Sequence, residues 1–442
     1  MGKIIQPRTL KGFRDQLPAS MIPRERLIDT AREVYRSFGF VPIDTPALEY
    51  TEILLGKGSD ESDKQMYRFE DPGGRDVSMR FDLTIPLARF VAQHAGTLGT
   101  PFKRYQIGPV WRGENTQRGR YREFTQCDFD TIGTESALAD AETILVIHSL
   151  FSRLGVGGFT IHVNERRILS GLFDRLGLLD VSVPLLRALD KLDKIGADGV
   201  TAEMVREAIV SEQQAQEVLR WAGLKGSNQE VLDALPEMVA GSEEGEAGLQ
   251  RLREVVEGAT AGGVTADQLV INLGIARGLD YYTGIVFETT LDDLPGIGSC
   301  CSGGRYDDLA SLYTKQRLPG VGASLGLDRL LAALEELERT EQIATTADVF
   351  LVLFGDQRIP DHIQLAAELR SAGLNVELYP EPKKLGAQFK YADRRGHTLA
   401  IVVGDEEWQR GVAQLKQMGN KQSQEVPLED LPAACRKLLA GE

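Results

Sequence analysis

Hydrophobic and polar residues follow two different periods along the chain. In "IPRERLIDTAREVYRSFGF", residues 22–40, apolar side chains recur near helical spacing and Gly39 follows as a stop signal, which predicts a helix. Residues 321–337 change from a strand-like to a helical pattern. Shorter stretches alternate every second residue, as strands do, at 104–114, 123–133, 159–164 and 284–291. Because few helical patterns separate these strands, the chain is predicted to have an antiparallel α+β core.

Two regions depart from this pattern. Residues 178–261 are leucine-rich, acidic and helical, and strand-like sequence resumes after them, which indicates an insertion into one domain. Near the C-terminus, short strands alternate with helices, which predicts a small mixed or parallel sheet. The predicted catalytic domain has two parts, residues 1–177 and 262–340. The helical insertion between them comprises residues 178–261, and the C-terminal domain comprises residues 347–442.

Composition places the chain among ordinary globular proteins. Of its 442 residues, 42% are hydrophobic and 26% are charged. No apolar run approaches the roughly 18 residues of a membrane helix, and the N-terminus lacks the apolar core of a signal peptide. The four cysteines show neither a CxxC pair nor zinc-ligand spacing, so they are interpreted as reduced thiols. We therefore predict a cytoplasmic protein with no membrane partner.

Charge is distributed unevenly. The net charge of −15 argues, taken alone, against a polyanionic partner. However, residues 102–122 carry six basic side chains against one acid, and residues 380–397 carry five against two. Such patches can bind nucleic acid on an acidic protein, although solvated helix faces explain them equally well on charge alone.

The segment "VWRGENTQRGRYREFTQCDFD", residues 110–130, brings together side chains suited to a nucleotide. If two strands flank a polar loop at 115–119, alternation places each set on one face. Arginine's planar fork suits phosphate oxygens, and phenylalanine can stack on a purine. An exposed polar hairpin is the alternative. The two sets are Arg112 and Glu114 on the first strand, and Arg122, Phe124, Gln126, Asp128 and Asp130 on the second.

Two further segments carry polar side chains near predicted element boundaries. In "MRFDLTIPLARFVAQH", residues 79–94, Asp82 and Thr84 can hold an ammonium group, or Thr84 can cap a helix that begins near Pro86. In "ARGLDYYTGIVFE", residues 276–288, an arginine, an aspartate and two tyrosines precede a strand. Taken alone, that peptide also fits a turn with a solvated arginine and half-buried tyrosines.

Together these motifs resemble those of class II aminoacyl-tRNA synthetases, and within that class the histidyl-tRNA synthetase family. Residues 110–130 are similar to the second class-defining motif, and "GVGASLGLDRL", residues 320–330, to the third. "IARGLDYYTG" (275–284) and "SGGRYDDL" (302–309) are similar to signatures of the histidine-specific branch. The resemblance covers nearly the whole chain except the acidic insertion.

The resemblance implies an antiparallel class II catalytic sheet with a helical insertion, followed by a mixed α/β anticodon-binding domain. It implies that histidine and ATP form histidyl-adenylate, and that the histidyl group then passes to the terminal adenosine of tRNA(His). ATP as substrate, Mg²⁺ on its phosphates and a homodimer are implied as well. The dimer would form through the N-terminal helix and residues 40–49. No metal-ligating side chains are predicted.

The matching positions carry residue roles implied by the family. Arg277 and Arg112 would be the catalytic arginines around the reacting carboxylate and α-phosphate. Histidine would be bound by Asp82, Thr84, Arg112, Gln126, Asp130, Arg277, Tyr281 and Tyr282. ATP would be bound by Arg112, Glu114, Arg120, Phe124 and Arg329. The tRNA would be bound by Gln117, Arg118, Lys383, Lys384 and Lys390.

Within the histidine site, Asp82, Thr84 and Gln126 would hold the ammonium group, and Asp130 and Tyr282 the two imidazole nitrogens. Tyr281 is expected to be pocket wall, because consecutive residues of an extended chain face opposite ways.

Departures from the family pattern are small. Ile275 stands where leucine or a valine-type residue is usual, and Asp82 and Asp130 stand where some bacterial relatives carry glutamate, which keeps the charge but shortens the reach. Arg305 can approach the site or pair with Asp307 or Asp308. Three alternatives remain: a regulatory paralogue that binds histidine without charging tRNA, a synthetase for another amino acid, and an RNA-binding adaptor.

Overall fold

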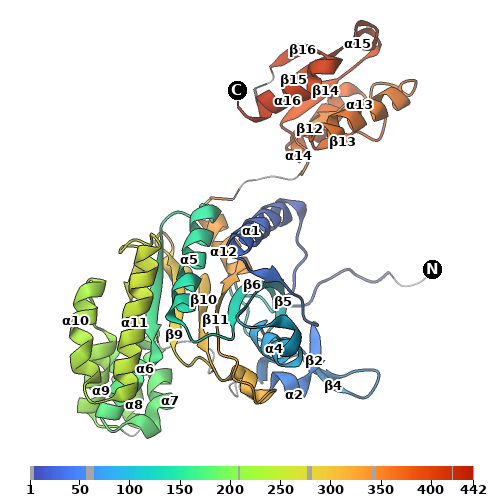
Figure 1. Cartoon of the computed structure of the whole chain (residues 1–442). Helices are drawn as coiled ribbons and strands as arrows, with labels where there is room; N and C mark the ends of the chain where they lie inside the picture. Colours follow the sequence, from blue (N-terminus) through green and yellow to red (C-terminus); the bar gives the residue numbers. More distant parts are fainter. Residues whose placement is uncertain are drawn as a thin grey trace. The chain divides into compact units, whose positions relative to one another are not determined.

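The computed structural model describes residues 4–55, 64–207, 210–275, 281–340, 345–420 and 422–441. Its contacts divide the chain into two units. The first comprises residues 1–14 and 27–340, and the second comprises residues 15–26 and 341–442. Figure 1 shows a central sheet with helices against it in the first unit, and a smaller sheet flanked by helices in the second.

An eight-stranded sheet forms the centre of the first unit. Its central pairs are antiparallel, as predicted, whereas β1 pairs parallel with β5 and β8 pairs parallel with β7 at the two edges. The parallel edge strands contain only two and three residues, too few to show a period. In spatial order the strands are β1 (Val41–Pro42), β5 (Phe102–Trp111), β6 (Glu123–Ile132), β11 (Gly320–Gly326), β10 (Cys301–Tyr306), β9 (Ile285–Leu291), β7 (Phe159–Glu165) and β8 (Leu269–Ile271).

Helices cover one face of this sheet. The predicted N-terminal helix is α1 (Pro18–Ser37), and the chain turns at Gly39, whose φ is +81°. From α1, Tyr35 packs its ring 5.0 Å from that of Phe129 and donates a hydrogen bond of 2.9 Å to the Cys127 carbonyl. The odd-numbered residues of β6 thus enter the core, which leaves its even-numbered residues for the opposite face. Among the described residues of the first unit, the other α-helices with assigned bounds outside the insertion are α2 (Thr51–Leu54), α4 (Thr84–Leu98), α5 (Ala137–Leu154), α6 (Arg166–Arg175) and α12 (Leu327–Glu336).

A small antiparallel sheet of three strands lies in the same unit, in the order β2 (Leu48–Tyr50), β4 (Asp76–Met79) and β3 (Arg68–Glu70). Leu48, Tyr50 and Phe69 from two of its strands are exposed apolar side chains.

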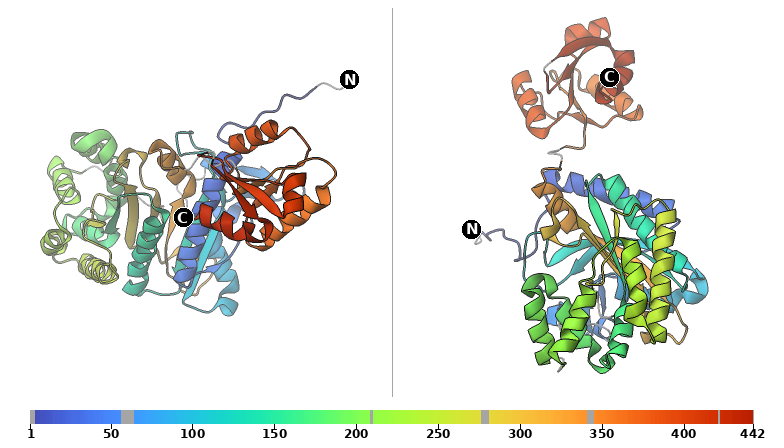
Figure 2. Two further views of the ribbon diagram at one scale, coloured as in Figure 1. Left: turned by 90° about the horizontal axis from the view of Figure 1, so that it is seen from above. Right: turned by 90° about the vertical axis from the view of Figure 1, so that its left-hand side faces the viewer.

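The acidic insertion is helical, as predicted. It comprises the 3₁₀ turn η1 (Leu179–Val181) and helices α7 (Ser182–Leu189), α8 (Leu192–Glu207, interrupted at Gly196), α9 (Glu212–Ala222), α10 (Asn228–Val239) and α11 (Glu243–Ala261). After α11 the chain re-enters the large sheet as β8. Figures 1 and 2 show α11 running beside α5 and α6. Apolar side chains of the insertion join the same core as the sheet.

A buried ion-pair network joins the insertion to the catalytic sheet. Asp140 of α5 accepts hydrogen bonds from Arg305 of β10, at 2.9 and 2.7 Å, and from Arg251 of α11, at 2.9 Å. Arg305 also donates to Asp307 at 3.1 Å. Of the two positions open for Arg305, the structure therefore favours the structural one, with Asp140 as a partner that the sequence did not suggest.

The second unit contains a five-stranded sheet in the order β13-β12-β14-β15-β16. The first three strands are parallel to one another and the last two join antiparallel, which confirms the predicted mixed sheet. Its elements are β12 (Val349–Leu351), α13 (Ile359–Ser371), β13 (Val376–Leu378), α14 (Leu385–Arg395), β14 (Leu399–Val402), α15 (Asp405–Arg410), β15 (Val412–Gln417), β16 (Ser423–Pro427) and α16 (Leu431–Leu439). Within the part of the chain that the structure describes, no helix has the length and apolar character needed to span a membrane.

Candidate active site

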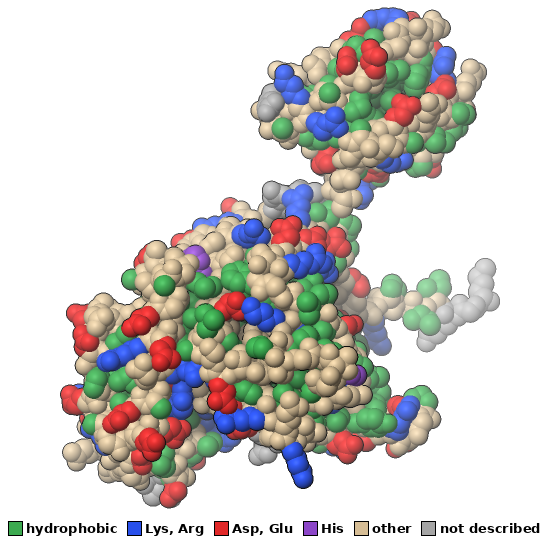
Figure 3. All heavy atoms as spheres, viewed as in Figure 1, with side chains coloured by type: hydrophobic (Ala, Val, Ile, Leu, Met, Phe, Trp, Pro, Cys, Tyr) green, Lys and Arg blue, Asp and Glu red, His purple; other side chains and the backbone are tan. Residues whose placement is uncertain are grey.

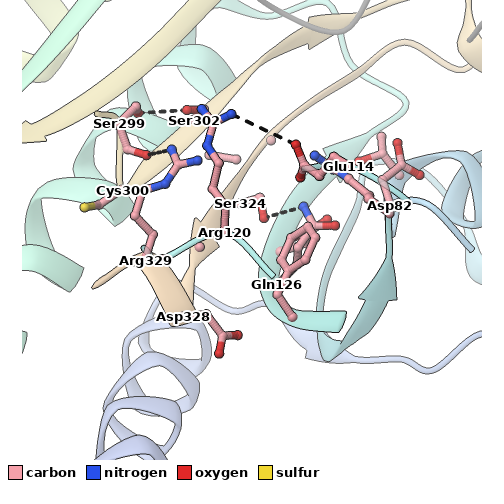
Figure 4. A pocket seen from close by; sticks show the side chains of 18 of the residues that line it. Asp82, Glu114, Arg120, Gln126, Ser299, Cys300, Ser302, Ser324, Asp328 and Arg329 are labelled. Carbon is pink, nitrogen blue, oxygen red and sulfur yellow. Dashed lines mark hydrogen bonds and ion pairs between the residues drawn. The ribbon is translucent and has the colours of Figure 1, made fainter. Parts of the chain in front are cut away.

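A pocket of about 290 Å³ opens on the face of the large sheet that the even-numbered residues of β6 line. It brings together side chains from β6, β10, β11, the loop before α4, the β5–β6 loop and the first turn of α12. Figure 4 shows the labelled side chains converging from these elements. Among the residues predicted from the sequence, the pocket is lined by Asp82, Thr84, Arg112, Glu114, Arg120, Phe124, Gln126, Asp130, Tyr281, Tyr282 and Arg329.

One end of the pocket is rich in hydrogen-bond acceptors. Asp82 lies just before α4, and its Oδ1 accepts the backbone N–H of Ile85 at 3.0 Å, so the predicted capping role falls on Asp82 rather than on Thr84. Its Oδ2 accepts the Tyr281 hydroxyl at 3.4 Å. Burial raises the pKa of Asp82, while Arg112 opposes that shift. Asp82 therefore both fixes the helix start and faces the pocket.

Asp130 is held from behind by two groups. Arg104 of β5, fully buried, forms an ion pair with its Oδ2 at 2.7 Å, and the Tyr306 hydroxyl donates to its Oδ1. Gly322 of β11 lies directly against this carboxylate, since a Cβ there would come within 2.2 Å of Asp130 Oδ1. Burial raises the pKa of Asp130, and Arg104 opposes the rise.

Gln126 and Asp128 line the pocket beside Asp130 on the same face of β6. The Gln126 amide donates to the Ser324 hydroxyl at 2.9 Å, a contact drawn in Figure 4. Among the described residues, neither Gln126 Oε1 nor Asp128 Oδ1 has a hydrogen-bond donor. Burial raises the pKa of Asp128 to about 7, with the Asp130 carboxylate adding to the effect and Arg104 opposing it. This end of the pocket thus offers unsatisfied acceptors to a ligand that carries N–H donors.

The other end of the pocket is cationic. Arg112 lies with its guanidinium 4.4 Å from the Phe81 ring centroid and 5.1 Å from that of Phe124. Arg329 donates to the Ser299 carbonyl, and Arg120 forms a 4.0 Å ion pair with Glu114.

Burial lowers the pKa of Arg329, and the positive charges of Arg120 and Arg112 lower it further. The guanidinium groups of Arg112, Arg120 and Arg329 repel one another in this partly buried pocket. A polyanionic ligand is favoured there, because its negative charge offsets the repulsion.

The β5–β6 loop closes tightly over this cationic end. Gln117 and Arg120 exchange backbone hydrogen bonds of 3.1 and 2.9 Å around Arg118 and Gly119. Gly119 has φ +70°, and a Cβ there would lie 3.3 Å from the Arg329 Cα, so glycine permits the loop to pack on α12. Gln117 and Arg118 point outward as exposed side chains, as their predicted contact with a macromolecule requires.

Both tyrosines of the "YY" pair line the pocket. The alternation expected of an extended chain does not hold for this pair, because both tyrosines precede β9 in a turn and an irregular segment. Tyr281 contacts Asp82, and Tyr282 packs against Gly304, where a Cβ would come within 2.9 Å of its ring. The rings meet edge to face with centroids 5.0 Å apart. Arg277, the remaining predicted residue of this peptide, lies outside the described residues.

The predicted tRNA-binding lysines lie in the second unit. Lys383, Lys384 and Lys390 are exposed at and around the start of α14, and Lys383 pairs with Glu381 at 2.6 Å. Gln388 of the same helix is fully buried, because its side chain hydrogen bonds both the N–H and the C=O of Leu353. On the face shown in Figure 3, basic and acidic side chains interleave, so the basic groups form local patches rather than one field.

Several pocket residues were not assigned a site role from the sequence. Asp128 shares strand parity with Gln126 and Asp130, so the alternation of β6 contained the signal. Tyr306 stands in the "GGRYDDL" peptide, but its contact with Asp130 spans 176 residues and no local pattern reveals it. Ser324, Ser299 and Cys300 reach the pocket only because β10 and β11 pair beside β6.

Comparison with known proteins identifies the family of the chain that forms this pocket. Residues 12–330 match the model of the histidyl-tRNA synthetase family, and residues 348–438 match that of the anticodon binding domain. The chain belongs to the histidyl-tRNA synthetase family. A family relative, the histidine–tRNA ligase of Rhodopirellula baltica, is 61% identical over 96% of each chain. That of Wolinella succinogenes is 47% identical over 99% of each.

Solved structures in the family have the same fold. The histidyl-tRNA synthetase from Nostoc sp. PCC 7120 superposes with a TM-score of 0.91 at 35% identity, covering 98% of this chain and 100% of that one. A protein described as an ATP phosphoribosyltransferase regulatory subunit/histidyl-tRNA synthetase from Bacillus halodurans C gives 0.75 at 25% identity, covering 88% of this chain and 97% of that one. The predicted class II catalytic domain, helical insertion and anticodon-binding domain are therefore confirmed.

Proposed function

We infer that the chain is a histidine–tRNA ligase, an ATP-dependent enzyme that forms histidyl-adenylate and transfers the histidyl group to tRNA(His). The observation that carries this inference beyond family membership is the polarity of one pocket. Arg112, Arg120 and Arg329 gather at one end, while Asp82, Gln126, Asp128 and Asp130 line the other. A triphosphate and an amino acid with several N–H groups match these two ends.

Each end is proposed to bind one substrate. At the acceptor end, Asp82, Thr84 and Gln126 hold the ammonium group, Asp130 and Tyr282 face the imidazole, and Tyr281 forms the wall. At the cationic end, Phe124 stacks on the adenine, Glu114 accepts its amino group, and Arg120 and Arg329 bind the outer phosphates. A site that satisfies both imidazole nitrogens rejects amino acids that lack them, because its buried polar groups would be left unpaired.

The chemical step needs charge stabilisation more than proton transfer. The histidine carboxylate is already ionised and attacks the α-phosphorus while pyrophosphate leaves, so no protein base is required. Arg112, at the cationic end, also interacts electrostatically with Asp82 of the acceptor end, and the family pattern assigns Arg277 to the carboxylate. Two guanidinium groups that reduce repulsion between carboxylate and phosphate stabilise the transition state. Arg277→Ala is expected to reduce the activation rate far more than histidine binding.

Magnesium fits this pocket as an ion carried by ATP. Within the described residues no cluster of three or more histidine, cysteine, aspartate or glutamate side chains is arranged to hold a metal. Mg²⁺ is commonly held by one or two carboxylates together with substrate phosphates, and Glu114 and Asp328 line the pocket. When bound, the ion would neutralise phosphate charge.

We further propose tRNA-contacting surfaces, a homodimer and a cytoplasmic location. Gln117 and Arg118 would meet the acceptor end of tRNA(His), and Lys383, Lys384 and Lys390 its anticodon region. A homodimer through the N-terminal helix and residues 40–49 is supported by exposed Val41, whose strand edges the large sheet, and by the neighbouring exposed apolar side chains of the small sheet. A cytoplasmic location is expected from the translation role of such enzymes.

Amino-acid-dependent exchange of pyrophosphate with ATP tests the enzyme assignment. The full-length protein, assayed with each of the twenty amino acids, should show exchange with histidine alone. Exchange with no amino acid would leave the regulatory-paralogue alternative, in which the fold binds histidine without activating it. That alternative is less supported, because the chain retains both the arginine at position 277 and the anticodon-binding domain.

The role of the second unit is tested by a triple variant. Replacing Lys383, Lys384 and Lys390 by alanine should weaken tRNA charging, because these lysines would contact phosphates of the tRNA backbone. Pyrophosphate exchange should stay intact, because that reaction does not involve tRNA. A control with the same charge change replaces the exposed lysines Lys225, Lys315 and Lys437. Equal loss of charging in both triple variants would contradict a specific tRNA surface.

A further inference from the structure

Two neighbouring carboxylates at the acceptor end differ in what already holds them. Asp130 Oδ1 accepts the Tyr306 hydroxyl, and Oδ2 lies 2.7 Å from the guanidinium of Arg104 in an ion pair, although it has no hydrogen bond among the described residues. These partners come from inside the protein and are themselves buried. A ligand that approaches Asp130 therefore meets a carboxylate whose charge is already neutralised.

Asp128 stands in the opposite situation. It lines the pocket between Gln126 and Asp130 on the same face of β6 and is only 2% exposed. Ser324 of β11, directly opposite in the sheet register, lies within hydrogen-bonding reach of one side of the carboxylate. Its Oδ1 has no donor among the described residues. A buried acceptor left without a donor is unfavourable, so a ligand that supplies an N–H to it gains affinity.

The surroundings of Asp128 indicate which donor of the ligand it meets. Tyr281, with Asp82 and Thr84, forms the part of the pocket assigned to the ammonium group. Tyr282 and Asp130 form the other part, and Asp128 stands two residues from Asp130 on the same face of β6. Asp128 therefore lies on the Tyr282 side, next to the residues that face the imidazole.

We propose that Asp128 accepts an N–H of the imidazole ring of bound histidine, beside Asp130, which Arg104 and Tyr306 hold in place. This proposal rests on the proposed function of the pocket and deepens it. It makes Asp128 a specificity-determining residue, because an amino acid with an apolar ring or chain would leave its oxygen without a donor.

A cycle of variants and ligands tests the assignment. L-histidine and imidazolelactate, its hydroxy-acid analogue in which a hydroxyl replaces the ammonium group, are titrated calorimetrically into full-length wild type, Asp128→Ala and Asp82→Ala. Asp128→Ala should weaken both ligands by a similar factor, about 10- to 100-fold, as expected for a hydrogen bond to a charged group. Asp82→Ala should weaken histidine far more than imidazolelactate, since only histidine carries the ammonium group.

Each other outcome has a defined meaning. Unchanged affinity for both ligands in Asp128→Ala, or a loss confined to histidine, would overturn the imidazole assignment. Asp128→Asn, which keeps the side-chain shape, serves where the alanine variant fails to fold, and failure of both to fold would make Asp128 a structural residue instead. Wild-type protein that does not bind histidine at all would contradict the proposed function rather than this inference.

Discussion

The two ends of the pocket differ in how their buried charges are balanced. At the cationic end, Arg112 and Arg329 each donate a hydrogen bond to a backbone carbonyl, and Arg120 forms an ion pair with Glu114. At the acceptor end, Asp128 and Asp130 are deeply buried, and Asp130 alone has a full countercharge. The cationic end thus satisfies part of its donors within the protein, whereas the acceptor end holds the buried carboxyl of Asp128, whose pKa is raised by burial. We therefore expect the acceptor end both to determine amino-acid specificity and to lower the free energy of unfolding.

The largest effect should come from breaking the Asp130–Arg104 pair. Asp130→Ala leaves a fully buried guanidinium without its countercharge, so the free energy of unfolding should fall by about 3–5 kcal/mol. Chemical denaturation measures it. The double variant Arg104→Met with Asp130→Ala should recover part of the loss, because neither charge then remains buried. A double variant no more stable than the single one would contradict the pairing.

At the cationic end, Arg112→Ala should spare stability and damage chemistry. A preorganised donor at the reacting phosphate contributes mainly in the transition state, so the rate of histidine-dependent pyrophosphate exchange should fall about 10²- to 10³-fold. Arg153→Ala, on an exposed surface pair with Glu33, is the matched control and should retain the wild-type rate. A rise in KM with unchanged kcat would show that Arg112 binds the ground state and the transition state equally, which would contradict a role specific to the transition state.

Asp128→Asn should change how stability depends on pH. In wild type the folded carboxyl has a pKa of about 7, against about 3.9 for an unfolded aspartate, so between these values the folded state binds more protons. Stability therefore falls as pH rises through that window. The variant lacks this loss, and its Tm relative to wild type should rise from pH 4 to pH 7 by about 2–4 °C.

Asp71→Asn is the control for this pH effect. The Arg75 partner lowers the pKa of Asp71, so the contribution of Asp71 is lost only as pH falls below the unfolded value. Its Tm difference from wild type should therefore stay flat from pH 5 to pH 7. A parallel rise in both variants would mean that the trend does not come from Asp128.

The smallest effect should come from the rim of the cationic end. Arg118 and Glu336 form a 2.9 Å pair in which both side chains are largely exposed. Such pairs contribute about 0–1 kcal/mol, so Glu336→Gln should barely change Tm, and the small change should vanish in high salt. A large loss would mean that this pair, rather than Gly119, fixes the loop on α12.

Local periodicity predicted the parts of the site that lie on a single strand. Alternation along β6 placed Phe124, Gln126, Asp128 and Asp130 on one face, and all four line the pocket, whereas Arg122, predicted with them, precedes the strand and does not line the pocket. The same rule did not apply to Tyr281 and Tyr282, because residues just before a strand need not follow its pleat. Arg104, Tyr306 and Ser324 were not predicted as parts of the site, since only the pairing of distant strands brings them there.

The Asp140 network has a consequence for exchanging modules between relatives. One countercharge of this buried carboxylate, Arg305, belongs to the catalytic sheet, and the other, Arg251, is contributed by the insertion. A graft that replaces the insertion with helices lacking an arginine at that point would remove half of the neutralisation beneath the strand that carries Tyr306. The inserted helices therefore cannot be exchanged independently of the catalytic sheet. A successful chimera must also retain an arginine that pairs with Asp140 as Arg251 does.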